Sequence, residues 1–286
     1  KQTGGTSSAA GGAIYSERRS IVTVNDSVFA DNTAELEGGA LYLSGETDAE
    51  VHGSSFTGSY AGKHGGAVTV RSSYLDMTDV TFSDNSRVQN GGTIYVSYNS
   101  SREMNAKVNL TDCSFTNSQS LEGYGGTIYA TKRTLEKEHP VLTMERVTIN
   151  GSTAAKSGGA MQVNTGLEAY LKDVNITNAD ALDGKGGAMY LAGAIVEYDG
   201  GQITNCTSTG NGGALDIEGD ADVTLNDITA SGNRSGTSGG FMYHKTATVK
   251  LYNSTIRNNT TEAGSGGAVY AQGPITVYNV LFEGNG

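Results

Sequence analysis

The sequence predicts an all-β fold, a single-stranded parallel β-helix (β-solenoid) of about ten coils that runs through residues 1–286 as one continuous domain. Three observations predict it. Ten Gly-Gly pairs recur at nearly fixed spacing, apolar residues alternate with a period of two, and no helical period of ten or more residues is present. A repeat of this size is typical of stacked units, none of which buries its apolar face alone.

Each unit opens with a Gly-Gly pair, and the residues behind the pair alternate as in a β-strand. The pairs begin at Gly11, Gly38, Gly65, Gly91, Gly125, Gly158, Gly186, Gly212, Gly239 and Gly266. The steps between them are 27, 27, 26, 34, 33, 28, 26, 27 and 27 residues. The expected inward row of these strands is Ile14, Leu41, Val68, Ile94, Ile128, Met161, Met189, Leu215, Met242 and Val269.

A second apolar phrase lies 9 or 10 residues before the next Gly-Gly pair. Its apolar members are Phe29, Phe56, Phe82, Phe115, Ile149, Ile176, Ile203, Ala230, Ile256 and Phe282. Five residues before each member, a further inward row is expected at Val24, Val51, Met77, Leu110, Met144, Leu171, Tyr198, Leu225, Leu251 and Val277. Asp, Asn or Gly commonly follows that row, as at Asp26 and Gly53, and predicts a turn. Each coil should therefore hold about three short strands.

The outward partners in the Gly-Gly strands form a row in which seven of ten residues are tyrosine. The seven are Tyr15, Tyr42, Tyr95, Tyr129, Tyr190, Tyr243 and Tyr270. Because tyrosine is amphipathic, stacked rings on one face of a rod could serve as a platform for sugars or for a neighbouring chain. The alternative is that identical stacked side chains simply stabilise a parallel ladder.

Insertions after the Gly-Gly strands of units four and five account for the two longest steps. They cover residues 97–107 and 131–140 and contain Arg102, Lys107, Lys132, Arg133 and Lys137. On an acidic rod these residues would form a basic protrusion, which is a second candidate partner-binding site because loops on a rigid scaffold often carry function. The alternative is a tolerated surface insertion.

Ten Asn-x-Ser/Thr sequons favour a secreted, N-glycosylated protein, although Asn, Ser and Thr are also common in turns. Eight are expected to be accessible: Asn25, Asn99, Asn109, Asn150, Asn175, Asn205, Asn253 and Asn258. The other two, Asn233 and Asn259, fall in the inward row that follows the second apolar phrase and should carry no sugar.

Composition excludes several classes of partner. A formal charge of −11 and a pI near 4.8 exclude nucleic acid, which needs a basic stripe. No apolar run approaches the roughly 18 residues of a membrane span, so this segment should not insert into a membrane. The two cysteines, Cys113 and Cys206, lie three coils apart and are expected to be buried free thiols.

The sequence predicts no cofactor and no metal. Asp79 and Asp112 occupy equivalent turns of neighbouring coils and could share a cation, but a turn role is favoured because 30 acidic residues on ten coils make such pairs common. The four histidines, His52, His64, His139 and His244, fall in different units and rows, and no nucleophile-base constellation is present.

The two repeated phrases together resemble the GGA-[ILV] and F-x-x-N repeats of the polymorphic outer-membrane protein family of chlamydial surface adhesins. The resemblance covers the chain from Gly11 to Asn285, and both motifs recur in register ten times. It implies a β-helical autotransporter passenger that is exposed outside the cell or at its surface. The membrane barrel of that family is not recognised in this sequence.

We therefore expect a non-enzymatic extracellular solenoid with a structural or adhesive role. The alternatives are a β-helical polysaccharide lyase or hydrolase, or a passive glycan-binding rod that uses the tyrosine row. The terminal coils are partial and carry no evident cap, and residues 282–286 stop within a repeat phrase. This predicts head-to-tail stacking, either of separate subunits in a filament or of tandem segments of a longer polypeptide.

Overall fold

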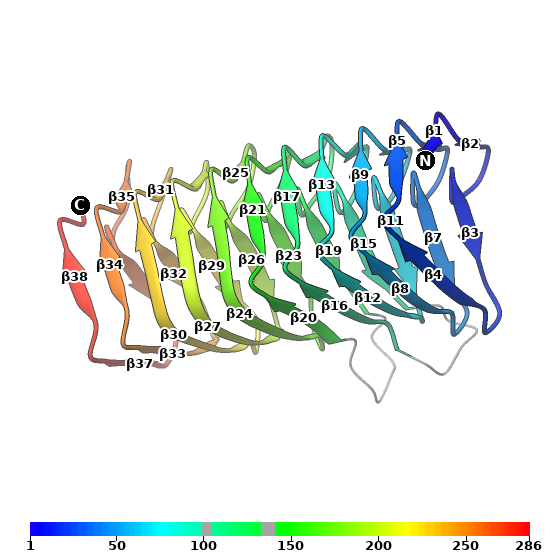
Figure 1. The fold of residues 1–286 in the computed structure, drawn as a ribbon. Coiled ribbons are helices and arrows are strands. Elements are labelled where there is room, and N and C mark those ends of the chain that lie inside the picture. Colours follow the sequence, from blue (N-terminus) through cyan, green and yellow to red (C-terminus); the bar gives the residue numbers. More distant parts are fainter. Residues whose placement is uncertain (99–104, 133–140) are drawn as a thin grey trace.

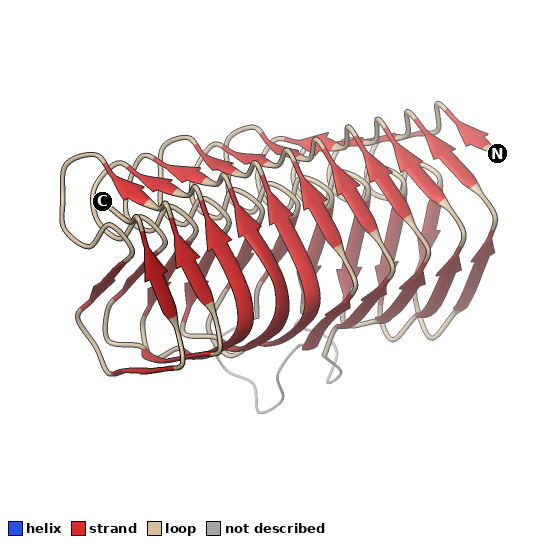
Figure 2. Cartoon of the chain, turned by 60° about the vertical axis from the view of Figure 1, so that its left-hand side comes forward, coloured by secondary structure: helices blue, strands red, loops and turns tan. Residues whose placement is uncertain are grey.

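The computed structural model describes residues 1–98, 105–132 and 141–286, which form one elongated β-solenoid with its termini at opposite ends (Figure 1). The described residues contain strands and turns but no helix. All strand pairs between successive coils are parallel, and they build three sheets along the rod (Figure 2). The predicted parallel β-helix of about ten coils is therefore confirmed.

The strands behind the Gly-Gly pairs form a ten-stranded sheet, called here the glycine sheet. Its strands are β3 (Ile14–Ser16), β7 (Leu41–Ser44), β11 (Val68–Arg71), β15 (Ile94–Ser97), β19 (Ile128–Ala130), β23 (Met161–Val163), β26 (Met189–Ala192), β29 (Leu215–Glu218), β32 (Met242–His244) and β36 (Val269–Ala271). Repeat positions pair directly, as Leu41 does with Ile14 and Val68. Coils are numbered one to ten after these strands.

The second sheet is the long sheet of 18 strands. Its strands are β1 (Gln2–Thr3), β4 (Ile21–Asn25), β5 (Val28–Ala30), β8 (Asp48–His52), β9 (Ser55–Thr57), β12 (Tyr74–Thr78), β13 (Thr81–Ser83), β16 (Lys107–Thr111), β17 (Ser114–Thr116), β20 (Val141–Glu145), β21 (Thr148–Asn150), β24 (Glu168–Thr177), β27 (Ile195–Thr204), β30 (Asp222–Ser231), β33 (Thr248–Tyr252), β34 (Thr255–Arg257), β37 (Ile275–Tyr278) and β38 (Leu281–Glu283).

The third sheet, the corner sheet, consists of ten two-residue strands. They are β2 (Thr6–Ser7), β6 (Thr33–Ala34), β10 (Tyr60–Ala61), β14 (Ser86–Arg87), β18 (Gln119–Ser120), β22 (Thr153–Ala154), β25 (Asp180–Ala181), β28 (Thr207–Ser208), β31 (Arg234–Ser235) and β35 (Thr260–Thr261). Most coils thus hold four strands instead of about three, because the long sheet bends within each coil at a residue with positive φ, such as Asp26 (φ 47°).

The Gly-Gly pair is explained by two separate constraints on the backbone. The first glycine has positive φ, as at Gly38 (φ 59°), which side-chain-bearing residues rarely adopt. The second glycine stacks directly on its counterpart: a Cβ added to Gly39 would lie 2.1 Å from the carbonyl oxygen of Gly66. The repeat period read from the sequence is therefore the period of this close backbone stack.

The core consists of the three inward rows, which the structure buries as expected in the internal coils. Four phenylalanine rings, Phe29, Phe56, Phe82 and Phe115, stack with centroids 4.6, 5.1 and 4.6 Å apart. The inward prediction is wrong only where no further coil covers the row: Val277 and Phe282 in the final strands are exposed.

Candidate functional surface

The tyrosine row lies on the outer face of the glycine sheet and contains three stacked pairs. The ring centroids are 5.0 Å apart for Tyr15 and Tyr42, 5.7 Å for Tyr95 and Tyr129, and 5.1 Å for Tyr243 and Tyr270. The row is interrupted in register by Thr69, Gln162 and Asp216. Tyr190 stands between two of these interruptions, so the expected column of rings is discontinuous.

The tyrosine rings are less exposed than an outward row predicts. Tyr15 is 53% exposed, but Tyr95 and Tyr243 are buried and the remaining four are partly buried. The cover comes from neighbouring side chains: the His64 ring stacks on Tyr95 at 4.4 Å, and the Arg71 guanidinium lies 5.4 Å from the same ring. The alternation of the strands therefore predicts the correct face for the tyrosine row. It overestimates the exposed area of the rings that a partner could contact.

A hollow of about 390 Å³ opens beside the first tyrosine pair and is bordered by Tyr15, Tyr42 and Leu36. Glu37 and Arg71 border it as well and are joined by two hydrogen bonds of 2.6 Å, from Nε and Nη2. Burial is the largest single influence and lowers the pKa of Arg71, but the hydrogen bonds to Glu37, the charge of Glu37 and the neighbouring tyrosines together raise that pKa. This hollow combines aromatic faces with a fixed guanidinium–carboxylate pair.

A second group of polar side chains surrounds Asp216, on the outer side of β29. Asp216 is 0% exposed, and neither carboxyl oxygen has a hydrogen-bond partner among the described residues. Glu218, two residues along the strand, instead accepts hydrogen bonds from Lys185 Nζ at 2.6 Å and from the Tyr190 hydroxyl at 2.9 Å. Tyr243 follows on the next coil.

The two carboxyl groups of this cluster have opposite pKa shifts. Burial, assisted by the negative charge of Glu218, raises the pKa of Asp216 to about 8. Burial is the largest single influence on Glu218 and acts in the same direction, but the hydrogen bonds from Lys185 and Tyr190, together with the charges of Lys185 and Lys245, lower the pKa of Glu218. Asp216 is therefore a neutral acid near pH 7, beside an ionised neighbour.

Most of each basic insert lies outside the described residues. Arg102, Arg133 and Lys137 are among the residues that are not described. Lys107, the first residue of β16, is exposed and lies on the outer face of the long sheet, in register with Tyr74. It borders a hollow of about 240 Å³ together with acidic side chains that include Asp76. Lys132 is partly buried, and its side chain packs over Gly166.

The sequons divide by exposure in the expected way where they are described. Asn25, Asn150, Asn205, Asn253 and Asn258 are exposed, and Asn109 and Asn175 are partly exposed. Asn99 lies outside the described residues. Asn233 and Asn259 are fully buried, and their amides form an internal ladder in which Asn233 Nδ2 donates to Asn259 Oδ1 at 2.8 Å.

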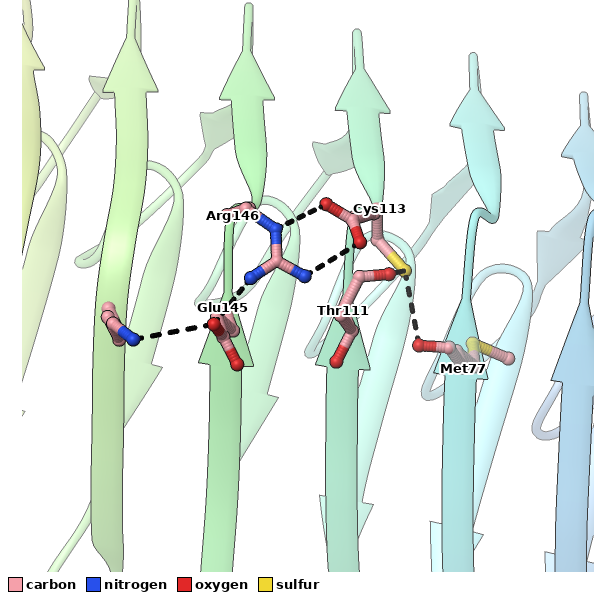
Figure 3. Close-up of polar contacts among 7 residues, drawn as sticks. Met77, Thr111, Cys113, Glu145 and Arg146 are labelled. Atoms are coloured by element: carbon pink, nitrogen blue, oxygen red, sulfur yellow. Dashed lines mark hydrogen bonds and ion pairs between the residues drawn. The ribbon is translucent and has the colours of Figure 1, made fainter.

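Asp79 and Asp112 both lie at corners of the coil, and Asp112 also forms an ion pair. Asp79 and Asp112 have φ of 56° and 54°, as expected for turn residues. The Arg146 guanidinium of the next coil binds both oxygens of Asp112, at 2.7 and 2.8 Å, and also contacts Glu145 (Figure 3). Hydrogen bonding to Arg146 lowers the pKa of Asp112. In the described part of the chain, no group of three or more His, Cys, Asp or Glu side chains could hold a metal ion.

Both cysteines are free and buried, as predicted. The Cys113 thiol faces the carbonyl oxygens of Thr111 and Met77, at 3.3 and 3.6 Å (Figure 3). Burial raises the pKa of Cys113 to about 11 and that of Cys206 to about 12, so both are unreactive thiols near neutral pH. Of the histidines, His244 is buried in the inward row as expected, and His139 lies outside the described residues.

Two groupings were not predicted from the sequence. Glu37 and Arg71 are 34 residues apart and meet because each projects from a neighbouring coil. Lys185 and Glu218 meet across coils seven and eight in the same way. One feature of the sequence could have indicated the second grouping. Asp216 is the one acidic residue in the tyrosine row, and a carboxyl group enclosed there needs either a hydrogen-bonding or charged partner or a bound proton.

Comparison with known proteins gives a family and one distant relative. The model of the right-handed beta helix region matches residues 5–139 and 141–286. A probable autotransporter of Escherichia coli strain K12, YfaL, is 26% identical over 223 residues, which are 74% of this chain. The match spans only 16% of that relative's length.

No solved structure matches the chain. Among the described residues there is no helix long and apolar enough to cross a membrane. Neither the family match nor the similarity to the Escherichia coli protein confirms the more specific resemblance to the chlamydial-type repeats. The family match covers almost every residue and agrees with the three-sheet architecture: the chain belongs to the right-handed beta helix family.

Proposed function

We propose that this chain is a non-enzymatic, structural or adhesive rod exposed at a cell surface or secreted. The observation that carries the proposal is the three continuous sheets, which occupy the described chain from end to end and leave long outer faces for a partner. The similarity to a protein named as a probable autotransporter supports an extracellular location. The resemblance of the two repeated phrases to those of the chlamydial surface adhesins supports the same location.

The first candidate contact on the side of the rod is the hollow between Tyr15 and Tyr42. Aromatic faces beside a fixed guanidinium–carboxylate pair suit a sugar ring or a protein side chain. Tyr42→Ala should weaken binding of the chain to glycans or to cell surfaces by about tenfold, while Tyr74→Ala, on the long sheet, should leave it unchanged. Equal binding by both variants would exclude this hollow as the contact.

The second contact in the proposal is end to end. Phe282, in the final strand, is exposed, and a further coil would bury it whether the coil came from a second copy or from a longer polypeptide. Where the further coil comes from a second copy, sedimentation and electron microscopy should detect stacked rods, and Phe282→Asp should abolish them. Tyr278→Ser, an outward change on the same coil, is the control. Single rods at all concentrations would contradict stacking of separate copies.

A polysaccharide lyase or hydrolase remains the alternative to this proposal. Two carboxyl groups with opposite pKa shifts, such as Asp216 and Glu218, can act as an acid and base pair. The complete burial of Asp216 argues against this role, because a polymer cannot reach that carboxyl. Cleavage of a uronate polymer by the purified chain, lost in Glu218→Gln, would overturn the non-enzymatic proposal.

A further inference from the structure

Two ion pairs on the outer face of the glycine sheet occupy equivalent places in the repeat. In each, the residue just before a Gly-Gly pair binds a residue on the next coil that lies two positions beyond the tyrosine row. Glu37 of coil two binds Arg71 of coil three at 2.6 Å. Lys185 of coil seven binds Glu218 of coil eight at 2.6 Å. The two pairs have opposite polarity, because the acid comes first in one and the base comes first in the other.

The ion pairs hold these charges at fixed places on the face. One partner of each pair precedes the tyrosine row along the chain and the other follows it, so the two side chains reach across the row between successive coils. The row is interrupted at both crossings, by Thr69 and by Asp216, and both of these residues are 0% exposed. The two crossings lie five coils apart, which is roughly 24 Å along the rod.

Two further charges lie near the ends of the same face. Glu17 of coil one and Lys245 of coil nine stand two positions beyond the tyrosine row, as the second member of each ion pair does. Glu17 accepts a hydrogen bond from the Tyr15 hydroxyl at 3.0 Å. Lys245 is exposed and acts electrostatically on Glu218. The signs of the charges therefore reverse from one half of the rod to the other, about a midpoint at coil five.

The outer face of the glycine sheet is electrically balanced, unlike the chain as a whole. The two rows that flank the tyrosines contain three acidic and three basic residues, which are Glu17, Glu37, Glu218, Arg71, Lys185 and Lys245. Asp216 adds no charge near pH 7, because burial raises its pKa to about 8. The formal charge of −11 therefore lies elsewhere on the rod. This face is consequently the one on which two copies of the chain repel each other least.

We propose that two copies of this chain pair side by side through the outer faces of their glycine sheets, with the rods antiparallel. The twofold axis runs along the strands at coil five, so the numbers of facing coils add up to ten. Glu37 then faces Lys185 of the second copy, and Arg71 faces Glu218 of the second copy. Symmetry makes each of these contacts occur twice.

The charges near the ends decide between antiparallel and parallel rods. In a parallel pair, each coil would face the same coil of the second copy with its strand direction reversed, and the two ion pairs would still meet opposite charges. Glu17 would then face Ala10, however, and Lys245 would face Ser238. In the antiparallel pair, Glu17 faces Lys245 of the second copy, so every charge on the face meets its opposite.

The face is large enough for a specific contact. Nine facing coils give an area about 43 Å long and roughly 15 Å wide, or ~650 Å² per copy. A standard protein interface buries about 800 Å² per partner. The inference rests on the proposed function, because it assigns a partner to a side of the exposed rod. A second copy would cover the hollow beside Tyr15 and Tyr42.

Exchange of charges within each ion pair tests the arrangement. All variants carry Phe282→Asp, so that end-to-end stacking does not contribute, and this parent should sediment as a pair that dissociates at high salt. Glu37→Lys combined with Arg71→Glu keeps an ion pair within the chain and reverses its polarity. Lys185→Glu combined with Glu218→Lys does the same for the other pair. Like charges then face each other, and each variant should pair about a hundredfold more weakly than the parent.

Mixing the two variants provides the matched control. An equimolar mixture should pair as the parent does, because each reversed ion pair then faces its opposite on the other variant. Either variant pairing with itself as strongly as the parent would overturn the antiparallel arrangement. A mixture that stays single, although both variants unfold thermally as the parent does, would overturn the matching of charges.

A second measurement leaves every charge in place. A water-soluble carbodiimide, which joins a carboxyl to an amine in direct contact, should link Glu17 to Lys245 in the Phe282→Asp chain. These residues are eight coils or about 38 Å apart within one chain, so the link must join two copies. A paired chain without this link would refute the antiparallel register. A chain that stays single at all concentrations and still binds glycans through Tyr42 would refute the pairing and leave the proposed rod function intact.

Discussion

At the scale of single residues, burial decides the chemistry of every ionisable side chain inside this rod. His244 points inward and has a pKa lowered by burial, so it is neutral at physiological pH. Arg87 is fully buried on the corner sheet, where burial lowers its pKa to about 9 and its guanidinium donates to Ser120 Oγ at 2.8 Å. Asp216 reaches neutrality in the opposite way, by holding a proton. His244 and Asp216 thus avoid a buried charge, whereas Arg87 stays protonated near neutral pH and donates hydrogen bonds to Ser120 Oγ and to the Lys63 carbonyl oxygen.

Asp216→Asn should stabilise the chain, with a gain that increases from about pH 4 to about pH 8. The folded pKa of Asp216 is raised to about 8 by burial, from about 3.9 in the unfolded chain. In that interval the folded chain binds a proton that the unfolded chain releases, so stability falls as pH rises. Asparagine does not titrate, and a displacement of about four pKa units corresponds to a gain near pH 8 on the order of 5 kcal/mol.

Urea unfolding at several pH values measures this gain. Asp220→Asn, exposed and in the next turn, controls for the loss of one negative charge and should show little change at any pH. A gain for Asp216→Asn that is constant from pH 4 to pH 8, or absent, would mean that Asp216 has an ordinary pKa in the folded chain.

The sequons give a second prediction at this scale. When the chain is secreted from a host that attaches N-linked sugars, Asn150 and Asn175 should be occupied and Asn233 should be bare. The first two face outward from the long sheet, whereas the Asn233 amide is enclosed and donates to the Ile203 carbonyl at 2.9 Å. Peptide mapping by mass spectrometry reads the occupancy directly. Sugar on Asn233 of the folded protein would show that the assigned strand faces are reversed.

At the scale of elements, the path of the backbone in each coil is determined by two corners and by the close stacking of glycines between coils. The first corner uses Asx or Gly at positive φ to bend the long sheet, and Arg146 takes that position in coil five with φ of 52°. The second corner is the Gly-Gly pair. Side chains fill the space between these corners, so the apolar rows vary among Ile, Leu, Val, Met and Phe while the glycines recur.

Gly39→Ala should destabilise coils two and three more than Gly219→Ala destabilises its turn. A methyl group at Gly39 would meet the Gly66 carbonyl oxygen, which belongs to a backbone stack that cannot move aside. A methyl group at Gly219 meets its nearest atom at 3.3 Å and mainly suffers from positive φ, a cost of about 1–2 kcal/mol. Thermal unfolding should separate the two variants. Equal losses would show that the stack is loose enough to accept a methyl group.

The sequence predicts the fold well because the fold is periodic. Ten aligned copies reveal the inward rows even where a single copy, such as that around Ala230, departs from the pattern. The side-chain clusters are not periodic, and the sequence does not predict them. Glu37 with Arg71 and Lys185 with Glu218 depend on which neighbouring coil a long side chain reaches. The burial of Tyr95 depends equally on a histidine contributed by the previous coil.

At the scale of the whole molecule, each coil contacts only its neighbours, so stability is approximately a sum over adjacent pairs. A change in one coil should therefore spread by one or two coils and no further. The same arrangement makes the ends the least protected part of the described chain, since Leu281 and Phe282 lack a covering strand. Partner binding along the side and stacking at the end are consequently independent properties and can be altered separately.

The ladders between coils also determine how the rod responds to mechanical force. Hydrogen bonds between successive coils run along the rod, so a pull on the two termini loads one ladder at a time and peels coils from an end. Single-molecule stretching should yield successive extensions of about 90 Å, the extended length of a 27-residue coil. The steps of 34 and 33 residues should give longer extensions of about 115 Å, which mark their position in the record. A single abrupt extension of the full chain would mean that the coils fail together. Sequential release would let such a rod lengthen under load without detaching at once from whatever it holds.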